Sequence, residues 1–204
     1  MSHRSPPTVL EMWSETSARL FEGAMQANRA AIEAFSAPVD GAGDAGDAAD
    51  ADAEDRIAPA EDLPEWDTES EVEAEPTVGD VVRFSKTLSE DDVDRFAAAS
   101  GDTNPIHLDD EWAGETRFQG RIVHGTLAAG LISAALARFP GSVVYLSQDL
   151  EFRAPVRLGD RVTAEVTIVE ALGDDRFRLR TTVERDDTLI IDGEAVVLID
   201  DPPA

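Results

Sequence analysis

The 204-residue sequence predicts an α+β domain in which one curved antiparallel sheet wraps around a buried central helix. The first observation is residues 125–139 (GTLAAGLISAALARF), which are apolar on almost every side, as is typical of a helix enclosed by other elements. The second is the series of strand-like runs after that helix, with apolar and polar residues alternating clearly in 161–168. These runs are 143–155, 161–171, 176–185 and 188–199.

Two further elements precede the central helix. Residues 78–88 read as a strand, and Ser89 is a natural N-cap for a helix over 90–100. The sequence GDTNP at 101–105 ends that helix. We therefore expect the folded domain to span residues 77–204.

The residues before this domain divide into two segments. Residues 1–39 predict an amphipathic helical extension, because apolar side chains recur there at helical spacing. Such an isolated helix is marginally stable, so its apolar face needs a partner, which could be its own domain, another chain or an apolar surface. Residues 40–76 carry 15 acidic residues and one arginine, which predicts a disordered acidic linker. Trp66 is expected to be solvent-exposed there, with a docking point as the alternative.

Composition excludes several classes of protein. The chain has 43 acidic and 17 basic residues, a net charge of −26, which disfavours nucleic acid and anionic lipid as partners. Lys86 is the only lysine, and this scarcity favours a halophilic source over an ordinary acidic protein. The absence of cysteine excludes disulfides and thiolate sites. No apolar run reaches the ~20 residues of a membrane span and no signal pattern is visible, so we expect a cytoplasmic protein.

The densest cluster of chemically capable side chains is SGDTNPIHLD at 100–109. Asp102 can accept a proton and His107 can donate or accept one, which is the equipment of general acid–base chemistry. Pro105 stiffens the turn between them. The alternative is structural: Asp102 and Asn104 would make side-chain-to-backbone turn bonds, and His107 would be a surface residue.

A second candidate is Gly125, at the start of the central helix. A free amide at a helix N-terminus favours negative charge, so it could hold a developing thioester enolate oxygen. A glycine chosen only for a tight turn is the alternative.

Together these residues resemble the MaoC-like dehydratase family, and most closely the short (R)-specific enoyl-CoA hydratases that feed polyhydroxyalkanoate synthesis. The resemblance covers about 120 residues. It departs from the family at Gly120-Arg121, where a proline is common, and this predicts a looser loop. The matching residues are Asp102-x-Asn104-Pro105-x-His107-x-Asp109, Phe118, Ile122-Val123-His124-Gly125, Tyr145-Leu146-x-Gln148-x-Leu150-x-Phe152-x-x-Pro155-Val156-x-x-Gly159-Asp160 and Gly193-Glu194-Ala195-Val196-Val197.

The resemblance implies a hot-dog fold and an (R)-specific enoyl-CoA hydratase, a hydro-lyase needing no cofactor beyond the coenzyme A of its substrate. It implies that Asp102 and His107 hold and activate the catalytic water and that the Gly125 amide binds the thioester oxygen. Ser133 would brace this pair, with a bond to its own helix as the alternative, and Asn104 would be a scaffold. His124 is expected to be structural. No metal is expected, because no second histidine stands at ligand spacing from His107.

The resemblance further implies a homodimer. Residues 1–39 resemble, more weakly, the phasins that coat polyester granules, which would place the enzyme at such a granule. Two other functions remain open. One is a dehydratase for a branched, dicarboxylic or fatty-acid-synthesis acyl thioester, and the other is a granule-associated structural protein with a non-catalytic hot-dog domain.

Overall fold

The computed structural model describes residues 63–72 and 75–200, so the predicted helical extension at 1–39 and most of the predicted linker lie outside the described residues. Within them the chain forms one six-stranded sheet and four helices. The elements are β1 (Trp66–Ser70), β2 (Val81–Thr87), α2 (Glu90–Ser100), α3 (Pro105–Leu108), α4 (Asp110–Gly114), α5 (Gly125–Leu136), β3 (Ser142–Phe152), β4 (Arg161–Gly173), β5 (Arg176–Arg185) and β6 (Thr188–Asp200).

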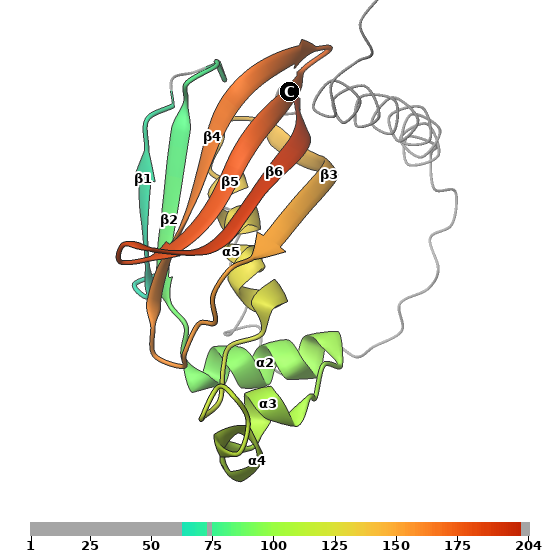
Figure 1. Ribbon diagram of the computed structural model, residues 1–204. Helices are drawn as coiled ribbons and strands as arrows, with labels where there is room; N and C mark the ends of the chain where they lie inside the picture. The colour runs from blue at the N-terminus through green and yellow to red at the C-terminus, as the bar shows by residue number, and fades with distance from the viewer. Residues whose placement is uncertain (1–62, 73–74, 201–204) are drawn as a thin grey trace, which may run out of the picture. The chain divides into compact units, whose positions relative to one another are not determined.

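The sheet has the order β1-β2-β4-β5-β6-β3, and each neighbouring pair is antiparallel. Helix α5 lies across its concave face and packs against β2, β4 and β5 (Figure 1). Apolar side chains from the helix and the strands form one core between them, including Ile132, Leu136, Val166 and Leu179. The predicted α+β fold, a curved sheet around a central helix, is confirmed.

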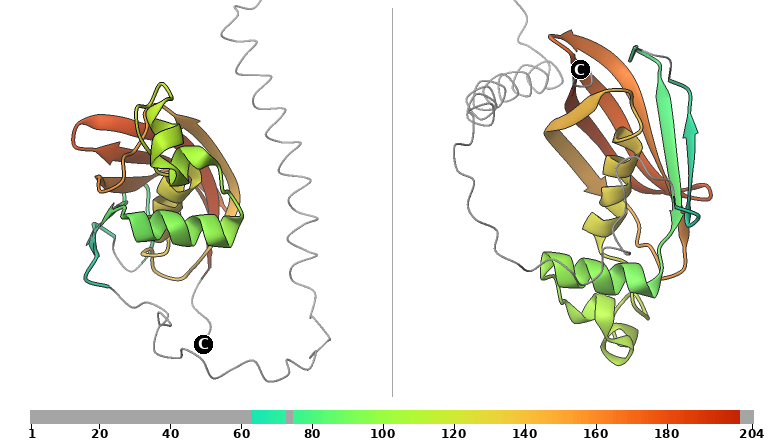
Figure 2. Two further views of the ribbon diagram at one scale, coloured as in Figure 1. Left: turned by 90° about the horizontal axis from the view of Figure 1, so that it is seen from below. Right: turned by 180° about the vertical axis from the view of Figure 1, so that it is seen from behind.

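Helices α2, α3 and α4 gather beyond one end of the sheet, near the N-terminus of α5, as both side views show (Figures 1 and 2). Ser89 caps α2 as predicted, in a capping box that Asp92 completes. The helix ends at Ser100, and its C-cap Gly101 has a φ of 76°, in the left-handed region that glycine adopts without strain. This end of the molecule therefore carries the 100–109 cluster.

Helix α5 differs in two ways from the prediction. It ends at Leu136 rather than Phe139, because the Arg138 and Phe139 amides bond three residues back, to Ala135 and Leu136, in a tightened last turn. It is also not enclosed on every side, since Gly125, Thr126, Gly130 and Ser133 are exposed in a single chain. No described helix is long and apolar enough to cross a membrane.

The predicted linker is wrong at its C-terminal end. Residues 66–70 form β1, which pairs with β2 from Trp66 opposite Lys86 to Ser70 opposite Val82. The Trp66 ring lies 5.5 Å from the Phe84 ring, so this tryptophan is partly buried against the sheet rather than stray in solvent. The strand was missed because a single large apolar residue in WDTES gives no alternating pattern to detect.

Candidate active site

The loop that carries Asp102 is built from side-chain-to-backbone hydrogen bonds. The Asp102 carboxylate accepts from the Asn104 amide at 3.3 Å, and the Asn104 side chain accepts from the Ile106 amide at 3.2 Å. Asn104 is thus the N-cap of α3, with Pro105 at the first helical position, where its missing N–H costs nothing. Such side-chain-to-backbone bonds are the purely structural role that the sequence leaves open for Asp102 and Asn104. The bonds are present, and they also fix the position of the exposed Asp102 carboxylate.

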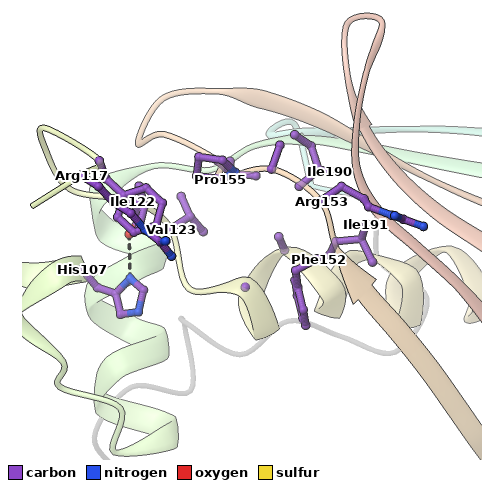
Figure 3. Close-up of a pocket in the computed structure, with 14 residues that line it drawn as sticks. His107, Arg117, Ile122, Val123, Phe152, Arg153, Pro155, Ile190 and Ile191 are labelled. Carbon is purple, nitrogen blue, oxygen red and sulfur yellow. Dashed lines mark hydrogen bonds between the residues drawn. The ribbon is translucent and has the colours of Figure 1, made fainter.

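His107 is buried, contrary to the alternative of a surface residue. Its Nδ1 lies 2.8 Å from the carbonyl oxygen of Ile122, the contact drawn in Figure 3. A carbonyl oxygen only accepts, so Nδ1 carries the proton in this bond. Nε2 of the neutral ring is therefore left with a lone pair that can accept a proton or a hydrogen bond from water.

His124 completes this group. Its ring stacks on that of His107, with centroids 3.8 Å apart and 28° between the planes. Its Nε2 lies 3.0 Å from the backbone carbonyl oxygen of Asp102. Asp102, His107 and His124 each offer a polar atom within 4.8 Å of the others. The sequence expectation of a structural His124 did not anticipate this contact, because sixteen intervening residues separate it from His107.

Among the described residues, these three side chains are the group whose spacing could hold a metal ion. Two of the four imidazole nitrogens already face backbone carbonyl oxygens, those of Ile122 and Asp102. Lone pairs lie in the ring plane, and in stacked rings they run side by side rather than converging on one ion. The arrangement fits proton transfer through water better than metal coordination.

Gly125 is the first residue of α5. His124, the N-cap, supplies no side-chain hydrogen bond, and the Leu127 amide donates to the His124 carbonyl oxygen at 3.1 Å, so the amides of Gly125 and Thr126 are the ones left for a ligand. A Cβ at Gly125 would stand 2.9 Å from Cε1 of Phe152. The glycine therefore lets the aromatic ring of β3 approach the helix N-terminus closely.

A cavity of about 330 Å³ joins His107 to Gly125. Its size is that of a small ligand pocket, and most of its wall is apolar. Figure 3 shows His107, Arg117 and Ile122 at one end, with Phe152, Arg153 and Ile191 at the other. Asp102 is close to the His107 ring but does not line the cavity itself. The remaining lining residues are Phe118, Val123, Gly125, Ala128, Ala154, Pro155, Val156 and Ile190.

Arginines hold the loop that leads to Gly125. Arg121 forms ion pairs with Glu90 and, at 3.0 Å, with Asp110, and the hydrogen bond that it donates to Glu90 raises the pKa of Arg121. Arg157 donates to the carbonyl oxygens of Phe118 and of Gly120, the latter at 3.0 Å. The loop is thus held in place despite lacking a proline, and no sequence pattern predicts the hydrogen bonds of Arg157 to it.

Ser133 is not brought to the predicted pair. It is exposed in the middle of α5 and does not line the cavity, about 12 Å along the helix axis from Gly125 at 1.5 Å per residue. Within one chain it makes no hydrogen bond to Asp102 or His107, and the bracing role expected of it stays a prediction.

Comparison with known proteins gives consistent matches. Residues 73–190 match the family described as MaoC like domain. The chain is 44% identical over 124 residues to the (R)-specific enoyl-CoA hydratase of Rhodospirillum rubrum, covering 59% of this chain and 86% of the relative. It is 47% identical over 119 residues to the 3-hydroxybutyryl-CoA dehydratase of Methylorubrum extorquens, covering 57% and 76%. The solved (R)-hydratase from A. caviae involved in PHA biosynthesis superposes with a TM-score of 0.59 at 40% identity, covering 61% and 98%.

Proposed function

Because the chain belongs to the MaoC-like domain family, we propose that it is an (R)-specific enoyl-CoA hydratase. It is a hydro-lyase that adds water reversibly to trans-2-enoyl-CoA and forms (R)-3-hydroxyacyl-CoA. The relatives named above, at 44% and 47% identity, support this assignment. The observation that carries it is that His107 and the open N-terminus of α5 line one cavity while the Asp102 carboxylate lies beside the His107 ring.

The geometry supports a mechanism for hydration. A water molecule at the mouth of the cavity would donate hydrogen bonds to the Asp102 carboxylate and to the His107 Nε2 lone pair. Asp102 accepts a proton as the water oxygen bonds to the β-carbon, and the electron pair of the double bond moves toward the thioester oxygen. The Gly125 amide stabilises that oxygen. The acid–base pair then returns a proton to the α-carbon, so the side chains end as they began and no cofactor is needed.

Arg117 is the residue we assign to the coenzyme A end of the substrate. It is exposed, lines the cavity with His107, and forms no ion pair with a carboxylate of the described residues. Arg121, by contrast, is engaged by two carboxylates. In a chain with a net charge of −26, an available guanidinium beside the site is the group that a phosphate would meet.

We further propose that the enzyme acts as a homodimer in the cytoplasm. Val144 and Tyr145 of β3, the edge strand beside β6, are exposed at 46% and 40%. They adjoin a groove between β3 and α5 that Ala129, Leu146 and Leu150 help to line. A second copy would cover this apolar edge together with the exposed stripe of α5. Supply of polyhydroxyalkanoate synthesis and association with a granule stay predictions, the latter resting on residues 1–39.

The assignment is tested with the purified full chain and crotonyl-CoA. We expect the ultraviolet absorbance of the conjugated thioester to fall and chiral chromatography to identify (R)-3-hydroxybutyryl-CoA. Parallel assays with mesaconyl-CoA and with crotonyl-loaded carrier protein separate the alternative dehydratases. Preference for either of these substrates, formation of the (S) product, or no turnover would contradict the proposal.

A further inference from the structure

His124 contacts the Asp102 loop and the His107 ring and directly precedes Gly125, but it does not line the cavity. It is 1% exposed, directly precedes Gly125, and stacks on His107. It also reaches the backbone of Asp102. One buried side chain therefore connects the loop of the acid, the ring of the base and the start of the helix that carries the free amide.

The hydrogen bond to Asp102 fixes the tautomer of His124. A carbonyl oxygen accepts, so Nε2 of His124 is the protonated nitrogen. Its Nδ1 is buried and has no hydrogen-bond partner in the structure. An apolar side chain would fill the same volume without leaving a buried polar atom unsatisfied. The histidine is therefore a poor choice for packing alone.

Stacking gives His124 a second contact with the site. Phe96 of α2 packs on the His124 ring with centroids 4.9 Å apart, and His107 stacks on it at 3.8 Å. The His107 ring is thus held by its bond to Ile122 within its plane and by His124 against its face. Together these contacts set the direction of the His107 Nε2 lone pair.

We propose that His124 is a positioning residue for hydration, which holds the Asp102 backbone and the His107 ring in their working geometry. This inference rests on the proposed function. His124 does not itself exchange protons with substrate, since its Nε2 faces a backbone carbonyl and its Nδ1 is sealed from the cavity. Its contribution therefore belongs to kcat rather than to binding.

The test uses two amides that differ by one methylene. In His124→Gln the side-chain nitrogen extends about as far as Nε2 and can still donate to the Asp102 carbonyl. In His124→Asn the nitrogen stops near the level of Nδ1 and cannot. Both variants lose the stacked ring, so their difference isolates the hydrogen bond.

We expect His124→Asn to lower kcat for crotonyl-CoA by up to about 10²-fold with little change in KM, as a small misplacement of reacting groups does. We expect His124→Gln to recover a clear part of that loss.

A matched control separates positioning from general stability. Val93→Ala removes volume from a buried side chain of α2, away from the cavity. We expect it to lower the melting temperature while kcat, assayed where the protein is folded, stays at the wild-type value. Equal kcat in the Gln and Asn variants, near-normal kcat in His124→Asn, or a matching kcat loss in Val93→Ala would each overturn the inference. Inactive wild-type enzyme would instead overturn the proposed function.

Discussion

The segment from Gly101 to Gly125 and the β4–β5–β6 meander bury different kinds of groups. In the meander, strands pair along their length and bury apolar side chains such as Leu179, Val183 and Ile191. In the 101–125 segment the buried side chains include His107 and His124, the buried histidines of the described residues. Their partners are backbone carbonyl oxygens rather than carboxylates.

The difference separates stability from chemistry. Apolar burial in the meander supplies free energy of folding that grows with the area removed from water. The hydrogen bonds of the 101–125 segment contribute less to folding but set the direction of each reactive atom. We therefore expect substitutions in the two regions to give opposite signatures in activity and in stability.

The largest expected effect is on activity. Asp102→Asn removes the group that accepts the proton of water, and loss of a positioned proton-transfer group costs on the order of 10² to 10⁴ in rate. Because Asp102 is exposed and the amide can still accept from the Asn104 backbone, stability should change little. Steady-state kinetics measure the loss of rate, and thermal unfolding measures the change in stability. A kcat near wild type, or a large fall in melting temperature, would refute this assignment.

In the meander we expect the opposite result, a loss of stability without a loss of kcat. Leu179 is fully buried on β5, opposite Ile168 of β4. Leu179→Ala should lower the free energy of unfolding by about 2–5 kcal/mol, as truncation of a buried leucine typically does. Denaturant unfolding measures this loss, and kcat per folded molecule should be unchanged. If kcat fell as steeply as in Asp102→Asn, the two regions would not be separable in the way proposed.

A smaller effect is expected at the coenzyme A end. Arg117→Gln should raise KM for crotonyl-CoA several-fold, since an exposed charge contact contributes roughly 1 kcal/mol or less. It should leave KM for crotonyl-pantetheine, which has no phosphate, unchanged. The control is Arg95→Gln, an exposed arginine of α2 that also lacks a described ion pair but does not line the cavity. The same rise in both variants, or a rise with both substrates, would argue against a phosphate contact.

The smallest effect is on the pH dependence of stability. Burial alone raises the pKa of Asp92, but hydrogen bonds from Lys86 at 2.6 Å and from Ser89 outweigh it and lower the pKa below 3.8. A lowered carboxyl pKa stabilises the fold above the unfolded value and loses this contribution as pH falls through the folded value. Asp92→Asn should cost about 1 kcal/mol at neutral pH, as capping residues do. Unfolding curves at several pH values measure the difference in free energy of unfolding between Asp92→Asn and wild type. This difference should shrink below about pH 4. A difference that does not change with pH would show that Asp92 has no such role.

The sequence predicted what periodicity and local chemistry determine. The limits of α2, β5 and β6 follow from alternation, the Ser89 cap and turn residues, and are confirmed within one residue. The pairing of β3 with β6 rather than with β4 was not predictable, because strand order depends on contacts far apart in the chain. Strand β1 was missed for the same reason, because its pairing with β2, and not its own sequence pattern, identifies it as a strand.

The candidate site divides along the same line. Asp102, His107 and Gly125 stood out because their chemistry is visible in short motifs. His124 and Arg157 did not stand out, because their roles depend on the backbone carbonyl oxygens that they contact only in the folded chain. Ser133 stays a prediction: its motif position matches, but it lies about two turns of helix after Gly125 and does not line the cavity.

The central claim is that Asp102 and His107 act on one water as a unit, and a double-mutant cycle tests it most directly. Asp102→Asn, His107→Ala and the double variant are compared by kcat/KM with crotonyl-CoA at a temperature where all three are folded. If the two side chains work together, the double variant should be little worse than the poorer single variant. Losses that simply multiply, so that the double variant falls by the product of the two singles, would contradict the account.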